Sequence, residues 1–301
     1  MSEDIPKIDS QISEIMLDSF RSSVEDTSNL FNYEEKKLID QLHLTFLTRS
    51  YVVKVTLNRQ EETVVFSPPS YFVRIESGSF IYNFLPEMTR FFENYSNLKE
   101  NNWLSFEGKP VPFDIPFGAL VDLLVGPNPT EPLELTIHFK ELPFFFGPGP
   151  TLTARTQTHL LQSLKESSLI RAGESQFFKI NFQKDDKDQI LKFVTEQSLS
   201  NARFVINKFL KYNRKKVVPV RIFSQIDNFF SSRNAQQSQT LIEFLASEFP
   251  ILEIKDSKPS PPYEQLSVYC FGIEVPWDVT FSCLEPTMMS LDGFIYLCLK
   301  W

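Results

Sequence analysis

Three stretches decide the fold of the first half of this chain: WLSFEGKP at residues 103–110, PFGALVDLL at 116–124 and LELTIHFK at 133–140. The first reads as a short strand that ends in a glycine-proline turn. The second begins with Pro116, which favours the first turn of a helix, and then repeats apolar residues at helical spacing. The third alternates and predicts another strand. Together they predict strand, helix and strand in close succession.

The residues before these stretches extend the same pattern. The β-branched and aromatic run at 42–58 predicts one strand, or two around Thr48-Arg49-Ser50, and 71–76 predicts another. Pro86 opens a helix with apolar residues on one face. Strand, strand, helix, strand, helix, strand indicates an α+β domain whose helices pack on one face of a sheet.

The segment FFFGPGP at 144–150 fits no regular element and marks a boundary. Helical periodicity follows at 154–171, 185–197 and 202–212. In the first of these helices we expect one apolar side. Its members are Leu160, Leu161, Leu164 and Leu169.

The β pattern returns at VVPVRIF, residues 217–223, where Pro219 suggests an edge or first-strand position. A helix at 238–249 and strands at 266–271 and 294–299 complete a β-grasp, or ubiquitin-like, module. The fold class expected is α+β, with two ubiquitin-like domains flanking a helix-rich domain. The expected divisions are an acidic, mostly disordered extension at 1–36, a first ubiquitin-like domain at 37–146, a helix-rich domain at 147–215 and a second ubiquitin-like domain at 216–301.

Composition narrows the possible functions. The 301 residues are 42% hydrophobic and 23% charged, as in ordinary globular proteins, and the net charge of −8 does not favour a nucleic-acid partner. We expect no transmembrane helix, because no apolar run approaches about 20 residues. We also expect no secretory signal or mitochondrial presequence. Only nine glycines occur, and no phosphate-cradling loop or HExxH motif is present.

The cysteines and histidines indicate neither a metal site nor a disulfide framework. Cys270, Cys283 and Cys298 lie in apolar stretches without CxxC spacing, which is typical of buried, reduced thiols. The three histidines, His43, His138 and His159, are isolated in sequence. A Cys/His nucleophile pair assembled in space stays open as an alternative, although no local motif supports it. We expect no cofactor and no metal.

Charge is uneven along the chain. Residues 1–30 hold seven acids against two bases, and one amphipathic turn around residues 12–20 could bind a partner. A basic cluster without acids lies between Gln197 and Gln225, and it is either a solvated helix face or an anion-binding surface. Its members are Arg203, Lys208, Lys211, Arg214, Lys215, Lys216 and Arg221.

The order EG-x-P at 107–110, P-x-G-x-x-x-DLL at 116–124 and L-T-x-HFK-x-x-P at 135–143 resembles the autophagy protein 5 family. The stretches VPVRIF at 218–223 and DGFIYL at 292–297 resemble its last domain. The resemblance covers about residues 40–301 and is thin in the helical part.

This resemblance implies a non-catalytic scaffold with two ubiquitin-like domains around a helical region. It implies binding of autophagy proteins 12 and 16 in an E3-like complex that recruits the E2-type protein 3, indirectly through protein 12. That complex promotes attachment of protein 8 to phosphatidylethanolamine during autophagosome formation. A cytoplasmic protein, peripheral on the preautophagosomal or isolation membrane, is expected.

One departure from the family matters. Protein 12 is normally attached to a lysine near the start of the first middle helix, and that position falls at about Thr153 here. No lysine lies between Glu141 and Leu164. Threonine could form only an ester, and arginine is effectively always protonated. Either a displaced lysine, Lys140 or Lys165, takes over, or protein 12 binds non-covalently, which we favour.

Two surfaces are expected to make contacts. Phe144, Phe145 and Phe146, beside the lost acceptor, could contribute an apolar surface for protein 12 or else plug the inter-domain loop. By resemblance, basic residues of the helical region face an anionic membrane. These are Lys165, Arg171, Lys208, Lys211, Arg214, Lys215 and Lys216. A tandem ubiquitin-like protein without an autophagy role is a third possibility.

Overall fold

The computed structural model describes most of the two predicted ubiquitin-like domains and one long helix between them. The described residues are 49–63, 66–96, 102–140, 142–143, 146, 151–173, 185, 188, 215–224, 229–249, 254–255, 258–259 and 265–300. The predicted extension at 1–36, residues 42–48 of the first predicted strand and nearly all of the helices predicted at 185–197 and 202–212 lie outside them.

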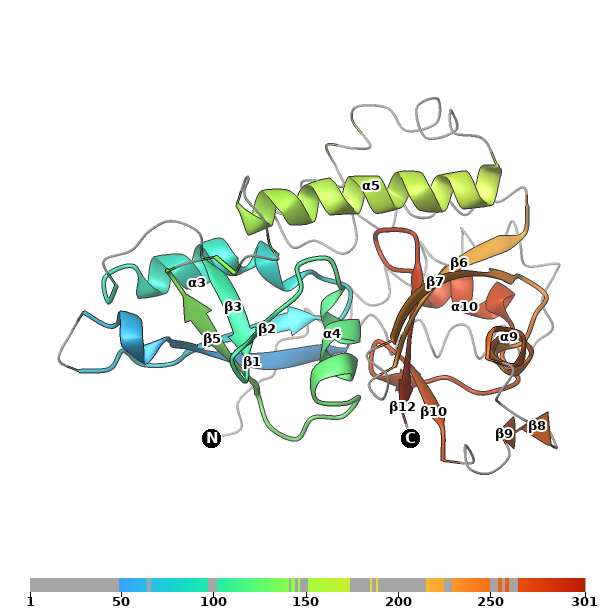
Figure 1. The fold of residues 1–301 in the computed structure, drawn as a ribbon, viewed down its shortest axis with the longest axis horizontal. Coiled ribbons are helices and arrows are strands. Elements are labelled where there is room, and N and C mark those ends of the chain that lie inside the picture. Colours follow the sequence, from blue (N-terminus) through green and yellow to red (C-terminus); the bar gives the residue numbers. More distant parts are fainter. Residues whose placement is uncertain are drawn as a thin grey trace, which may run out of the picture.

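The first domain is a five-stranded sheet with helices on one face (Figure 1). Its elements are β1 (Ser50–Leu57), η2 (Arg59–Glu61), β2 (Tyr71–Glu76), η3 (Ile81–Asn83), α3 (Leu85–Phe92), β3 (Trp103–Phe106), β4 (Lys109–Pro110), α4 (Phe117–Leu124) and β5 (Leu133–His138). The strand order is β2-β1-β5-β3-β4, and only the β1–β5 pairing is parallel. This is the β-grasp arrangement, and the strands and helices predicted within these residues are confirmed.

The second domain repeats the arrangement. Its elements are β6 (Val217–Ser224), β7 (Phe229–Gln236), α9 (Leu241–Glu248), β8 (Ile254–Lys255), β9 (Lys258–Pro259), β10 (Ser267–Cys270), β11 (Ile273–Glu274), α10 (Phe281–Met288) and β12 (Ile295–Lys300). The sheet order is β7-β6-β12-β10-β11, with β6 and β12 parallel and β8–β9 a separate pair. If the five strands of each sheet are numbered in chain order, both sheets therefore have the order second, first, fifth, third, fourth.

Pro219 lies in the first strand of this domain, although β6 is not an edge strand. It pairs with Asn234 of β7, while the pairing of β6 with β12 begins only at Val220, opposite Ile295. The backbone of Pro219 is therefore not paired with β12, and the N–H that proline lacks removes no hydrogen bond to that strand. The prediction did not include β7, because FFSSRNAQ does not alternate, or α10, which contains Pro286.

Helix α5 (Leu152–Ala172) lies across both domains and packs against η3 and β6 (Figure 1). The Thr151 side chain caps its first turn by accepting from the Ala154 amide, and Gly173 ends it in the left-handed region. Leu160 and Leu164 are buried as predicted. Leu169 is 45% exposed, so its place in the apolar stripe is wrong. The physical reason is that nine residues beyond Leu160 is about half a turn around the helix.

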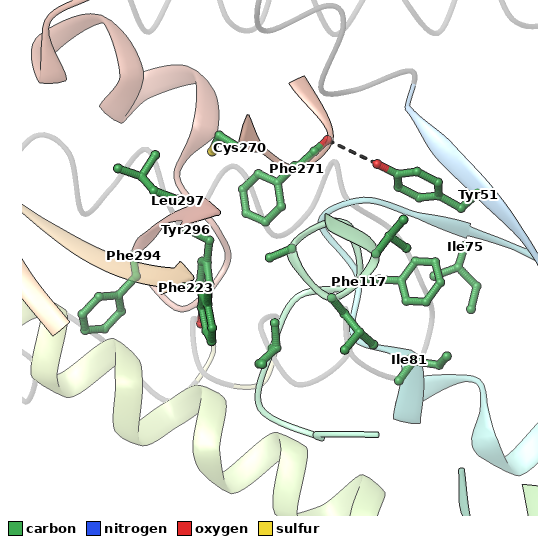
Figure 2. Packing of buried hydrophobic residues seen from close by; sticks show 14 of the residues in the cluster. Tyr51, Ile75, Ile81, Phe117, Phe223, Cys270, Phe271, Phe294, Tyr296 and Leu297 are labelled. Carbon is green, nitrogen blue, oxygen red and sulfur yellow. Dashed lines mark hydrogen bonds between the residues drawn. The ribbon is translucent and has the colours of Figure 1, made fainter. Parts of the chain in front are cut away.

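The apolar cores of the two domains join in one cluster. Figure 2 shows the junction, where the Tyr51 hydroxyl of β1 points at the carbonyl oxygen of Phe271 from the second domain, while Phe117 of α4 points toward Ile75 of its own domain. The rings of Tyr51 and Phe117 meet edge to face, with their centroids 5.9 Å apart. Both rings belong to the first domain, and the hydrogen bond from the Tyr51 hydroxyl to the Phe271 carbonyl, at 3.5 Å, joins them to the second domain in addition to the bridge formed by α5.

Candidate functional site around helix α5 and the domain contacts

The residue at the expected acceptor position is tied into the first domain. Thr153 stands in the first turn of α5, and its hydroxyl donates to the carbonyl oxygen of Tyr82 in η3 at 3.1 Å. The side chain is half-buried. This position therefore connects the helix to the sheet domain and presents no amine.

The two fallback lysines lie in different places. Lys140 is exposed just after β5, where its carbonyl accepts from the Trp103 indole at 2.9 Å. Lys165 is exposed on α5, about 18 Å along the helix axis from Thr153 and about a third of a turn around it. Lys165 therefore faces a different side of α5 from a residue at 153.

A buried carboxylate fixes the chain where it leaves β5. Glu61 of η2 is 5% exposed, and its Oε2 accepts the amides of Phe139 at 2.5 Å and Lys140 at 3.1 Å. Asn58 donates to Oε1 at 3.2 Å. Three donors compensate the buried charge, so Glu61 sets the direction in which the HFK segment continues.

Phe146 is buried, with 4% of its surface exposed, and its ring lies 6.2 Å from that of Phe113. The prediction that Phe146 contacts a partner is therefore wrong, because a side chain packed in the core offers no surface. The alternative, an apolar plug, agrees with its position. Phe144 and Phe145 lie outside the described residues.

Arg171 is also placed differently from the prediction. It is 1% exposed, its Nε donates to Glu285 Oε1 at 2.9 Å, and Gln237 donates to the other oxygen of Glu285 at 2.7 Å. The membrane-contacting role of Arg171 is wrong, because the buried face of α5 carries this side chain into the second domain. The sequence alone did not indicate a partner for Arg171, since Glu285 is 114 positions away.

A second buried ion pair lies nearer the middle of α5. Arg221, counted in the basic cluster, is 7% exposed and donates to Asp292 at 2.9 Å and to Ser163 of α5 at 3.0 Å. Its guanidinium also lies 4.0 Å from the Phe294 ring centroid. The Tyr296 hydroxyl donates to Asp292 at 2.6 Å, and burial raises the pKa of that phenol. The second domain thus holds α5 through directed polar contacts.

The remaining predicted basic residues divide into two groups. Lys165, Lys215 and Lys216 are exposed. Arg203, Lys208, Lys211 and Arg214 lie outside the described residues. Lys215 crosses the end of α5, where a Cβ on Gly173 would lie 2.3 Å from its Cε. In the part of the chain that the structure describes, no helix combines the length and apolar composition that crossing a bilayer requires.

The cysteines are poorly placed for nucleophilic chemistry. Cys270, Cys283 and Cys298 are all buried. Burial raises the pKa of the Cys270 thiol well above its ordinary value and that of Cys298 to about 12. A thiol that stays protonated is a weak nucleophile. Among the described residues, no group of three or more His, Cys, Asp or Glu side chains could hold a metal ion.

Ser105, His138 and Glu61 form a chain with the atom order of a hydrolase triad. The Ser105 Oγ lies 2.8 Å from His138 Nε2, and Glu61 Oε1 lies 3.5 Å from His138 Nδ1. The Asn58 amide also lies 3.0 Å from Nδ1, nearer than Glu61, so this nitrogen has two polar neighbours. Ser105 is also only 2% exposed. The chain is therefore a structural network, stacked on Trp103 with ring centroids 3.9 Å apart.

The contact between the domains contains a buried acid that the sequence prediction missed. Asp122 of α4 has no exposed surface, and its Oδ2 accepts the Gly272 amide of the second domain at 2.7 Å. Burial raises the pKa of Asp122 to about 7, against the lowering effects of that amide, Arg49 and Lys300. A carboxylate inside the apolar helix segment FGALVDLL was the available signal.

Two sheets of identical strand order with a long helix across both define a tandem ubiquitin-like protein. Residues 48–139 match the UblA domain of autophagy protein ATG5, and residues 217–299 match its UblB domain. The chain belongs to the autophagy protein 5 family. Family membership gives it a role in autophagy and removes the possibility of a tandem protein unrelated to that process.

Several relatives and one solved structure are similar over most of the chain. The autophagy protein 5 of Pichia angusta is 24% identical over 246 residues, which cover 77% of this chain and 87% of the relative. That of Candida albicans is 25% identical over 271 residues, covering 82% and 92%. The crystal structure of Kluyveromyces marxianus Atg5 superposes with a TM-score of 0.70 at 19% identity, covering 87% of this chain and all of that one. The structural likeness supports the fold.

Proposed function

We propose that this protein is a non-catalytic scaffold that binds autophagy protein 12 non-covalently and also binds autophagy protein 16. The resulting E3-like complex recruits the E2-type protein 3 through protein 12. It promotes transfer of protein 8 to phosphatidylethanolamine on the growing isolation membrane, with the scaffold cytoplasmic and peripheral to that membrane. Membership of the autophagy protein 5 family supports the general role.

The observation that carries the non-covalent part is the state of Thr153. An isopeptide bond needs an amine nucleophile, and Thr153 offers a hydroxyl that is already donating to the Tyr82 carbonyl at 3.1 Å. A surface of ordinary size, about 1,600 Å² in total, can hold a partner without a covalent bond. The helix start thus supports a role in docking and not in attachment.

The test is co-expression with protein 12 and its conjugating enzymes, followed by mass analysis under native and denaturing conditions. We expect a complex in native buffer and only unmodified chains after denaturation. T153K serves as a matched variant, since it places an amine at the helix start and should regain a denaturation-resistant adduct if the enzymes still reach that point.

The covalent alternative has a distinct signature. If the wild-type chain carries an adduct that resists denaturation and K140R/K165R removes it, a displaced lysine is the acceptor and the non-covalent proposal is wrong. Co-purification with protein 16 from the same cells tests the second partner, and its loss from a folded scaffold would contradict that part of the proposal.

The proposed lack of catalysis is supported by the buried thiols and by the burial of Ser105 beside His138. Replacing all three cysteines by alanine tests the enzyme alternative. If the folded triple variant still supports lipidation of protein 8, a thiol nucleophile is excluded. If lipidation stops while both partners remain bound, the scaffold-only proposal fails.

Weak membrane contact is a second candidate, supported by the exposed Lys165, Lys215 and Lys216. Each basic residue near an anionic bilayer contributes about 1 kcal/mol, so three residues can retain the protein only weakly. Flotation with phosphatidylserine vesicles should fall in high salt and in the triple charge-reversal variant K165E/K215E/K216E. Flotation that is unchanged by both would contradict an electrostatic contact.

A further inference from the structure

The tight turn between β10 and β11 contacts the first domain at α4 and Tyr51. Phe271 and Gly272 form this docking turn, and both have positive φ, 53° and 77°. Phe271 has no exposed surface, and its Cβ lies 3.0 Å from where a Cβ on Gly118 of α4 would be. Its carbonyl oxygen faces the Tyr51 hydroxyl at 3.5 Å (Figure 2). A buried side chain therefore packs between Gly118 of the first domain and Tyr296 of its own domain, from a strained backbone position.

The first domain contains the corresponding turn, which makes no contact with the second domain among the described residues. Glu107 and Gly108, between β3 and β4, have φ values of 48° and 77°, and Glu107 is exposed. A bulky non-glycine residue at positive φ is disfavoured, and such strain persists only where the surroundings compensate for it. At Phe271 the compensation comes from burial against α4. The docking turn is thus held in place by the inter-domain contact.

Asp122 supplies the polar part of that contact. Its Oδ2 accepts the Gly272 amide at 2.7 Å, whereas its Oδ1 is buried without a hydrogen-bond partner among the described residues. An ionised carboxylate with one bare oxygen is costly in a dry interface. A neutral carboxylic acid keeps the bond from Gly272 and removes the buried charge.

The charged and titratable groups around Asp122 come from both domains. Arg49 and Tyr51 approach from the first domain, and Cys270, Cys298 and Lys300 approach from the second. The Arg49 guanidinium is already occupied, because it donates to the Tyr51 hydroxyl at 2.8 Å and to Asn128 at 2.9 Å. Among the described residues, the hydrogen bond that Asp122 accepts comes from the neutral Gly272 amide, so no bonded cation neutralises its charge.

We propose that Asp122 is a proton-operated latch between the two ubiquitin-like domains: as a neutral acid it holds the docking turn against α4, and as a carboxylate it favours opening of that contact. The raised pKa, about 7, agrees with this geometry. The ordinary value is 3.8, so the closed state binds the proton more tightly than the open state between pH 3.8 and about 7. Closure is favoured at low pH, and this advantage is lost as the pH rises to about 7.

Hydrogen exchange of the peptide that contains Gly272 tests the latch in the full-length protein. After correction for the intrinsic exchange rate, the opening equilibrium should rise between about tenfold and about a hundredfold from pH 5 to pH 8. D122N keeps an acceptor for the Gly272 amide but cannot ionise, so its opening should not change with pH. The amides of β1, in the sheet core, report global unfolding in the same samples.

Glu76 provides the matched control, because burial raises its pKa too and it stands at the end of β2, beside Arg74. E76Q should leave the pH dependence of the Gly272 peptide intact. The proposal is overturned if the wild-type profile is flat, if D122N retains it or if E76Q abolishes it. Should D122N not fold, the carboxyl carbon of Asp122 can be followed by NMR in the wild type. A titration near the ordinary value of 3.8 would equally overturn the proposal.

Discussion

Removing Glu285 should be among the most damaging single changes on the second domain, because it leaves the Arg171 guanidinium charged and buried. Arg171 and Glu285 are 1% and 2% exposed, so water cannot replace the lost partner in the folded state. The remaining contacts of the guanidinium, to the Ser167 carbonyl at 3.5 Å and the Met289 sulfur at 2.9 Å, do not neutralise it. In E285A the Arg171 guanidinium has therefore lost the carboxylate with which it pairs.

The expected loss in the free energy of unfolding is about 3–5 kcal/mol, the range for breaking one side of a buried ion pair. For a chain of this size that corresponds to a fall of about 6–10 °C in the unfolding midpoint. The double variant R171M/E285L removes both charges and should lose less than E285A, because apolar side chains of similar volume can replace a buried pair at little cost.

Thermal and urea unfolding of both variants measure the effect. The control is E248A, which breaks the more exposed Arg233–Glu248 pair, 2.5 Å apart, and should cost at most about 1 kcal/mol. If E285A is no more damaging than E248A, or if the double variant loses as much as the sum of its single changes, the account of a buried, mutually dependent pair is refuted.

Three further outcomes follow from the same contacts. F271A should lower the free energy of unfolding by about 3 kcal/mol or more, read from urea unfolding, because a fully buried ring leaves a cavity at the domain junction. G272A should lower the thermal midpoint more than G108A, since a Cβ at 272 would lie 2.2 Å from the Tyr51 hydroxyl whereas nothing lies within 4 Å at 108; equal effects would contradict the close approach. Burial lowers the pKa of His138, so the unfolded chain binds its proton more readily and stability should fall as the pH drops below about 6.5; midpoints between pH 5 and 7.5 should show a shallower fall in H138N, and parallel curves would argue against this.

The sheet of the first domain could be predicted because its pattern is local. LELTIH at 133–138 alternates, and the structure buries Leu133, Leu135 and Ile137 as that alternation implies. Pro116 and the apolar spacing after it likewise place α4 correctly. The periodicity and the turn residues of such elements lie within the segment itself, so these elements can be predicted without knowing what packs against them.

The contacts that hold the domains and α5 together could not be predicted in the same way. Arg171 in the last turn of a helix reads as a solvated cation, and only the fold brings Glu285 to it. Phe271 reads as one more core phenylalanine, although it packs against Gly118 of the other domain. The prediction missed β7 for a different reason. Its polar residues form a strand because they pair along the whole length of β6.

The two turns with positive φ also bear on self-association. A domain that contacts its neighbour through the turn between its third and fourth strands makes a head-to-tail contact. Such contacts, repeated between copies, generate open fibres. Here the turn residue of the second domain is the apolar Phe271, while the corresponding residue of the first domain is the exposed Glu107. Because Glu107 is charged and exposed, this turn of the first domain carries no apolar side chain with which to make the corresponding contact to another copy.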